Sequence, residues 1–176
     1  EFGTEWEQRK RHLLHGMLFN AIYRKADVTV PVGPNLAQKL IQHGFDPDRV
    51  HAVPQPFDSD LFSPVSSQER KHLKRRLGLE LDRMVILNVG RLTWGKGADR
   101  VLKIAKRVHQ KSDAYQFCLV GDGEYANVFR QQFTSEDVHC PGYVPREQVH
   151  KYFRVADLLI HPSRRDALPN VILEAL

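Results

Sequence analysis

The fold class of this chain is decided by the stretch Met84-Val85-Ile86-Leu87-Asn88-Val89-Gly90-Arg91. The first six residues form a nearly continuous apolar run, which is typical of a strand buried on both faces of a parallel sheet. A glycine and an arginine follow directly after this run. Ligands of such sheets bind beyond the carboxyl ends of the strands, so Gly90 and Arg91 are the first candidates for a binding site.

Segments with strand and helix character alternate around this run. The predicted strands cover 28–32, 49–53, 84–89, 116–120, 138–140 and 157–161. The predicted helices cover 5–25, 35–43, 66–77, 97–110, 124–133 and 146–153, and Pro169 opens a last one. The alternation predicts an α/β fold, a Rossmann-like parallel sheet with helices on both faces.

Two helices carry more detailed predictions. Ser66 and Glu69 have the spacing of a capping box at the start of helix 66–77. The exposed face of that helix is expected to hold Arg70, Lys71, Lys74, Arg75 and Arg76. The inward face of helix 97–110 is expected to hold Ala98, Val101, Ile104, Ala105 and Val108.

Composition narrows the class of protein without choosing a partner. The chain has 176 residues, enough for one ordinary domain, with 41% hydrophobic and 27% charged residues, which fits a globular fold. Its net charge of +5 permits contact with phosphates, nucleic acid or an anionic membrane surface, the last through its basic helices. No apolar run approaches the ~20 residues that a membrane span needs.

The two cysteines, Cys118 and Cys140, have no metal-type partner at close spacing. Cys118 lies in an apolar run, where it is expected to be a small buried hydrophobe. Reduced thiols favour a cytoplasmic location, with the inner face of the membrane as an open alternative.

Arg91 and Lys96 are two cations on one turn, flanked by glycines. An arginine fork and a lysine point charge that converge there suit a diphosphate, although ordinary surface cations would have the same spacing. The glycines do not form G-x-G-x-x-G, so a nicotinamide enzyme is disfavoured.

The C-terminal segment adds two carboxylates, Asp166 and Glu174, which suit sugar hydroxyls. Between them, Pro169-Asn170-Val171 would start a helix whose free N–H groups offer an anion site, although every helix has such an end. Because the chain ends within that apolar helix, we expect it to be a part of a longer protein.

These residues resemble the family-4 retaining glycosyltransferases of the GT-B fold. The matching pieces are Val89-Gly90-Arg91-Leu92 with Lys96-Gly97, Val120-Gly121-Asp122-Gly123, Gly142-Tyr143-Val144, and Pro162-Ser163 through Glu174-Ala175-Leu176. The resemblance covers roughly residues 26–176. It implies that residues 5–33 end an N-terminal domain and its linker, and that residues 34–176 are an incomplete C-terminal domain that binds a nucleotide-sugar.

The resemblance also implies roles for individual residues. Arg91 and Lys96 would hold the diphosphate, Glu174 the ribose, and Asp166 would lie near the donor sugar. The backbone at Tyr143 and Val144 would meet the base. Further donor-binding positions are Gly90, Leu168, Asn170 and Val171. Two positions depart from the family's pattern: Asp166 is one methylene shorter than the usual glutamate, and Ala167 replaces a common glycine.

The resemblance therefore implies a retaining hexosyltransferase that uses a UDP- or GDP-linked sugar, needs no metal or other cofactor, and acts on an unidentified acceptor. Asp166, Arg91 and Lys96 are the predicted catalytic residues. Two other readings stay open. A non-catalytic nucleotide-binding module would bind the ligand without turnover, and a basic nucleic-acid-binding domain would show steep salt dependence. Nucleic acid is not expected, because the chain lacks the interleaved aromatic residues of single-strand binders.

Overall fold

The computed structural model describes residues 25–56, 58–164, 166 and 169–176. The predicted helix 5–25 lies outside these residues except for Lys25, and Leu168 lies outside them as well. The chain divides into two compact units between Pro56 and Phe57. This division falls later than residue 34, where the sequence places the start of the C-terminal domain, and the assignment of residues 5–33 to another domain stays a prediction.

The first unit contains helix α2 (Pro34–Gln42) and the short 3-10 helix η1 (Pro47–Arg49). The strands predicted at 28–32 and 49–53 are wrong as strands, because only one parallel bridge joins Thr29 to Val50. Pro31 has no N–H to donate to a ladder, and Pro47 starts a helical turn that Asp46 caps. Backbone bonds from His51 to Thr29 and from Val53 to Pro31 keep the two segments paired.

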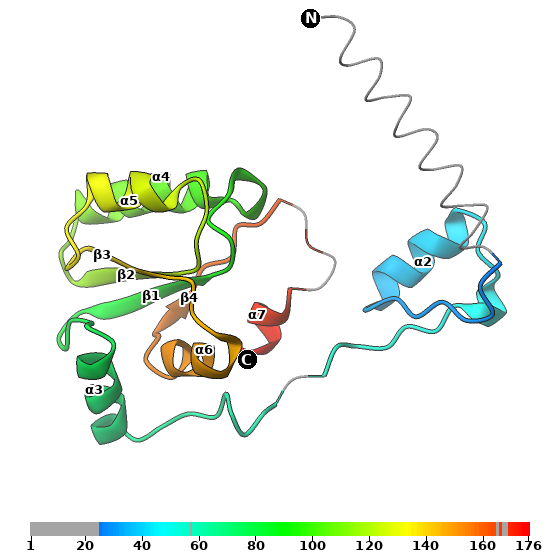
Figure 1. The fold of residues 1–176 in the computed structure, drawn as a ribbon, viewed down its shortest axis with the longest axis horizontal. Helices are drawn as coiled ribbons and strands as arrows, with labels where there is room; N and C mark the ends of the chain where they lie inside the picture. The colour runs from blue at the N-terminus through cyan, green and yellow to red at the C-terminus, as the bar shows by residue number, and fades with distance from the viewer. Residues whose placement is uncertain (1–24, 57, 165, 167–168) are drawn as a thin grey trace, which may run out of the picture. The chain divides into compact units, whose positions relative to one another are not determined.

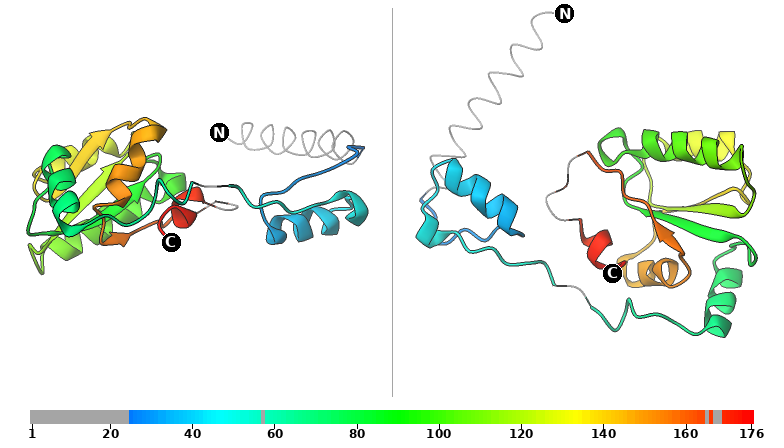
Figure 2. Two further views of the ribbon diagram at one scale, coloured as in Figure 1. Left: turned by 90° about the horizontal axis from the view of Figure 1, so that it is seen from below. Right: turned by 180° about the vertical axis from the view of Figure 1, so that it is seen from behind.

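The second unit is a four-stranded parallel sheet in the order β3-β2-β1-β4. Its strands are β1 (Met84–Val89), β2 (Tyr115–Val120), β3 (Val138–Gly142) and β4 (Leu158–Leu159). Figures 1 and 2 show helices α4 (Ala98–His109) and α5 (Ala126–Gln132) on one face, and α3 (Ser67–Arg76) and α6 (Arg146–Phe153) on the other. The predicted α/β class, with helices on both faces of a parallel sheet, is confirmed.

Side chains of the two central strands alternate between two cores. Ile86, Phe117 and Leu119 pack under α4 and α5, whereas Val85 and Leu87 pack toward α6. All are buried, which explains the continuous apolar run that the sequence shows in β1. Cys118, also fully buried, belongs to the second core, as predicted.

Two side-chain predictions need correction. Ile104 is 37% exposed, because the buried stripe of α4 runs through Ala98, Val101 and Ala105. Lys74 is only 4% exposed. Its ammonium donates to the backbone carbonyl oxygens of Glu80 (3.1 Å), Leu81 (3.3 Å) and Arg83 (2.6 Å). Three acceptors compensate the burial of one charge, so Lys74 stabilises the turn before β1.

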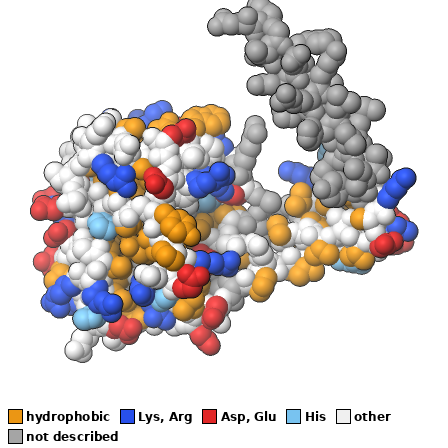
Figure 3. All heavy atoms as spheres, in the orientation of Figure 1, with side chains coloured by type: hydrophobic (Ala, Val, Ile, Leu, Met, Phe, Trp, Pro, Cys, Tyr) orange, Lys and Arg blue, Asp and Glu red, His pale blue; other side chains and the backbone are white. Residues whose placement is uncertain are grey.

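The other basic residues of α3 also differ in exposure, because one is paired and partly buried and three are exposed. Arg70 pairs with Asp157 at 2.7 Å, while Lys71, Arg75 and Arg76 stay exposed, and Figure 3 shows basic side chains gathered over this helix. Ser66 caps the helix as predicted, since its hydroxyl accepts from the Glu69 N–H. The exposed basic face is therefore smaller than the sequence suggests.

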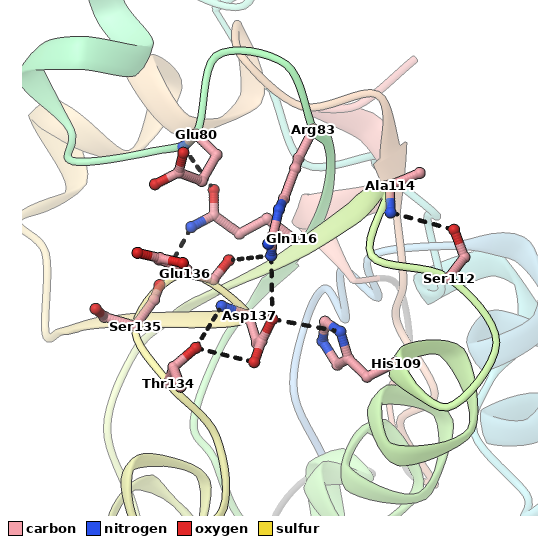
Figure 4. Close-up of polar contacts among 10 residues, drawn as sticks. All are labelled: Glu80, Arg83, His109, Ser112, Ala114, Gln116, Thr134, Ser135, Glu136 and Asp137. Carbon is pink, nitrogen blue, oxygen red and sulfur yellow. Dashed lines mark hydrogen bonds and ion pairs between the residues drawn. The ribbon is translucent and has the colours of Figure 1, made fainter.

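Polar contacts close the amino ends of the strands (Figure 4). The buried Gln116 side chain accepts from the Glu80 N–H at 2.9 Å and donates to the Ser135 carbonyl at 3.2 Å. Asp137 accepts from Arg83 at 3.0 Å and from the Thr134 hydroxyl at 2.9 Å. These bonds join the segments before β1 and β3 to β2, so the polar side chains at the amino edge of the sheet stabilise the fold.

Candidate functional site

The carboxyl edge of the sheet carries the predicted site residues. A pocket of about 450 Å³ lies at the ends of β1 and β2 and beside the segment after β3. It is lined by Val89, Gly90, Arg91, Val120, Gly121, Asp122, Tyr143, Val144 and Val149. The structure thus brings together Gly90, Arg91, Tyr143 and Val144, which the resemblance placed around the diphosphate and the base. Apolar walls beside one arginine suit a flat ring attached to an anionic group.

Close approach of two loops shapes this pocket. Gly121 has φ +134°, and a Cβ added there would lie 2.0 Å from the Gly90 carbonyl oxygen. The Gly90 N–H donates to Val120, and the Gly121 N–H donates to Gly142. The ends of the three adjacent strands are therefore held together by backbone contacts that leave no room for a side chain at Gly121.

A second group of predicted residues forms an ion pair. Lys96 ends the 3-10 helix η2 (Trp94–Lys96), and its Nζ lies 2.5 Å from Asp166 Oδ1. The other carboxylate oxygen of Asp166 lies 2.9 Å from His161 Nε2. The side chains of Lys96 and Asp166 are 28% and 21% exposed, so a ligand can still reach the pair.

The environment of Asp166 favours its charged form. Burial would raise the pKa of this carboxyl, but hydrogen bonds from Lys96, Ser163 and His161 outweigh burial and lower the pKa to about 2. His161 was not among the predicted site residues, although it ends the predicted strand 157–161, directly before Pro162-Ser163. Its place at the carboxyl edge was the signal that could have identified it.

The pKa of Asp166 is about 2 in the folded protein and ordinarily 3.8, so the free energy of unfolding depends on pH through this group. Its contribution is fully present above the ordinary pKa and is lost as the pH falls toward 2. We expect the difference in unfolding free energy between wild type and Asp166→Asn to shrink as the pH falls from 6 to 2. Chemical denaturation at several pH values measures this difference. A constant difference over the range would contradict the ion pair.

The predicted residues of the last helix belong neither to the pocket at Arg91 nor to the Lys96–Asp166 ion pair. Helix α7 (Asn170–Leu173) has four residues, with Pro169 as its N-cap and Glu174 as its C-cap rather than deeper within the helix. Such a short helix offers too few aligned peptide groups to support an anion site. Asn170 Oδ1 is buried with no hydrogen-bond partner, and Val171 is half-buried.

Glu174 lines a different pocket, of about 570 Å³, together with Arg70, Phe153 and Leu158. Burial raises the pKa of its carboxyl, and nearby Arg146 partly offsets this. The described structure therefore does not bring Glu174 into the pocket of Gly90 and Arg91, and its contact with a ribose stays a prediction.

Within residues 25–56, 58–164, 166 and 169–176, no group of three or more His, Cys, Asp or Glu side chains could hold a metal ion. In that same part of the chain, no helix combines the length and apolarity required to traverse a bilayer.

Comparison with known proteins defines the class. Residues 69–176 match the family described as glycosyl transferases group 1. EpsF of Bacillus subtilis (strain 168), which is named as a glycosyltransferase, is 30% identical over 178 residues, covering 98% of this chain and 45% of that protein. The chain therefore belongs to the glycosyl transferases group 1 family.

Two further relatives extend this result. The alpha-galactosylglucosyldiacylglycerol synthase of Streptococcus pneumoniae is 23% identical over 159 residues, covering 88% of this chain and 42% of that enzyme. Anabaena HepE, solved in complex with UDP-glucose, shares the fold with a TM-score of 0.75 and 22% identity, over 92% of this chain and 46% of that one. The α/β fold is that of GT-B glycosyltransferases. The chain spans less than half the length of each of these three proteins.

Proposed function

We propose that this chain is the donor-binding part of a retaining hexosyltransferase that uses a nucleoside-diphosphate sugar and no metal. The observation that carries the proposal is that the loop after β1 supplies both the Arg91 wall of the pocket and Lys96 of the ion pair. One loop thereby presents two cations at the carboxyl edge of a sheet in a glycosyltransferase chain. Cations of this kind neutralise the charge that develops on a diphosphate leaving group.

In this proposal, the pocket and the ion pair bind different parts of the nucleotide-sugar donor. The base occupies the apolar space beside Tyr143 and Val144, and the diphosphate lies against Arg91 and Lys96. The Lys96 ammonium has three N–H donors, so it can contact the diphosphate while one of them stays on Asp166, whose carboxylate then lies beside the donor sugar. The UDP-glucose complex of the structural neighbour HepE favours a uridine nucleotide.

The acceptor is proposed from the surface charge of α3 and from the product of one relative. The exposed cations of α3, Lys71, Arg75 and Arg76, suit an anionic membrane surface on its cytoplasmic side. The pneumococcal relative is named for a glycolipid product. We therefore propose a lipid-linked or polysaccharide acceptor for the complete protein.

Titration calorimetry with UDP, GDP and ADP tests the proposal. We expect at least one of the three nucleotides to bind the 176-residue chain, and its affinity to be the same with EDTA as with magnesium, because Arg91 and Lys96 supply the positive charge that a metal would otherwise bring. Inorganic phosphate serves as the control for unspecific anion binding. A divalent ion that proved necessary for binding would contradict the metal-free part of the proposal, and no binding of any of the three would overturn it.

A further inference from the structure

The loop after β4 lies directly against the loop after β1, as Figures 1 and 2 both show. The Arg164 N–H donates to the Gly95 carbonyl at 3.1 Å, and Arg100 donates to the Pro162 carbonyl at 3.1 Å. Gly97 has φ +79°, and a Cβ there would lie 2.2 Å from the Pro162 carbonyl oxygen. The two loops are therefore in backbone contact, and Gly97 makes that contact sterically feasible.

The Arg164 side chain strengthens this contact. Its guanidinium forms two parallel bonds to Asp99, at 2.6 and 2.8 Å, and donates to the Trp94 carbonyl at 2.5 Å. It also lies over the Trp94 ring, 4.1 Å from the centroid. Both charged side chains are 19% exposed. Two-pronged arginine–carboxylate bonds fix orientation as well as distance, so this contact restrains the two loops more than a single lysine bond would.

The contacts of Arg164 with Trp94 and Asp99, called the clamp below, join the same two segments as the Lys96–Asp166 ion pair: the loop after β4, and the stretch from η2 into the start of α4. Lys96 lies two residues after Trp94, and Asp166 lies two residues after Arg164. Glu124, from the loop after β2, holds η2 from its other side through the Trp94 N–H at 2.8 Å. We propose that Arg164, held by Asp99, is a positioning residue that fixes Lys96 against Asp166. The role of Arg164 in positioning Lys96 is argued from the structure alone. Its effect on binding of the nucleotide-sugar donor rests on the proposed function.

The carboxyl titration of Asp166, measured by NMR, tests the first part without any ligand. In Arg164→Ala we expect the pKa of Asp166 to rise toward its ordinary value, because Lys96 no longer stays at hydrogen-bond distance. Arg130→Ala, at an exposed arginine on α5, is the matched control and should leave the pKa unchanged. Gln116→Leu, at the opposite edge of the sheet, controls for a general loss of stability. An unchanged pKa in Arg164→Ala, or an equal rise in Gln116→Leu, would overturn the proposal.

Nucleotide affinity tests the second part. We expect Arg164→Ala and Asp99→Ala each to weaken binding of the best nucleoside diphosphate about three- to tenfold, the scale of freeing one ordered side chain. The double variant should lose no more than either single variant, and Arg164→Lys should recover part of the affinity. Full additivity, or single variants that bind like wild type, would contradict the positioning role. If the wild-type chain binds no nucleotide, the proposed function fails, while the Asp166 titration still decides the clamp.

Discussion

Replacing Gly121 with alanine is expected to destabilise the fold by about 2–6 kcal/mol. The new methyl group would meet the Gly90 carbonyl oxygen at 2.0 Å, and an alanine at φ +134° is strained as well. Backbone strain of about 1–3 kcal/mol adds to an overpacking cost of similar size. Because small domains have only about 5–15 kcal/mol of stability, the variant should melt far below wild type in a denaturation experiment.

Two other glycines separate the steric cost from the strain. Gly90 has φ +142° but nothing within 4 Å of an added Cβ, so Gly90→Ala should show the strain alone, about 1–3 kcal/mol. Gly95 has free space and no positive φ, so Gly95→Ala should stay close to wild type. If Gly121→Ala is no less stable than Gly90→Ala, the close approach of the two loops is not as described.

Replacing Lys96 with alanine is expected to weaken nucleoside-diphosphate binding about 10- to 100-fold. A charge-assisted hydrogen bond contributes roughly 1.5–3 kcal/mol, which corresponds to that range. The loss should lie toward its upper end, because the Asp166 carboxylate would remain without Lys96 and would repel the diphosphate. Calorimetry with the nucleotide that wild type binds best measures the change.

Matched variants make the Lys96 result specific. Lys103→Ala removes an exposed lysine from α4 and should leave affinity unchanged, so it controls for net charge. The double variant Lys96→Ala/Asp166→Asn should recover part of the lost affinity, since it also removes the repelling carboxylate. A dissociation constant in Lys96→Ala equal to that of wild type would show that Lys96 is an ordinary surface cation.

The secondary structure of the second unit could be predicted because its signals are local. Strand β1 begins at Met84 and ends at Val89, as predicted, and helix α6 also has the predicted bounds. Prediction failed where proline chemistry interrupted a pattern, as at Pro31 and Pro47 in the first unit. The hydrophobic period of residues 97–110 predicted a helix, but it did not define where the buried face of that helix ends. Ile104 was therefore predicted to face inward, whereas it is 37% exposed.

The candidate site could be predicted in part. Gly90 and Arg91 were predicted at the carboxyl edge because they directly follow a predicted strand. Lys96 was predicted as a second cation on the same turn, and the family resemblance indicated the role of Asp166. It could not find His161, Asp99 or Arg164 as partners. It also grouped Glu174 with residues that line a different pocket.

By itself, then, the sequence determined the α/β class and the edge of the sheet where the candidate site residues lie, because hydrophobic period and strand ends are properties of neighbouring residues. Only the tertiary structure decided which side chains meet. Lys96 and Asp166 are 70 residues apart, and Arg164 and Asp99 are 65 apart. Burial of Lys74 and the steric need for Gly121 also depend on backbone atoms that approach through folding. Such contacts arise from the packing of loops on one sheet edge, and no local pattern encodes them.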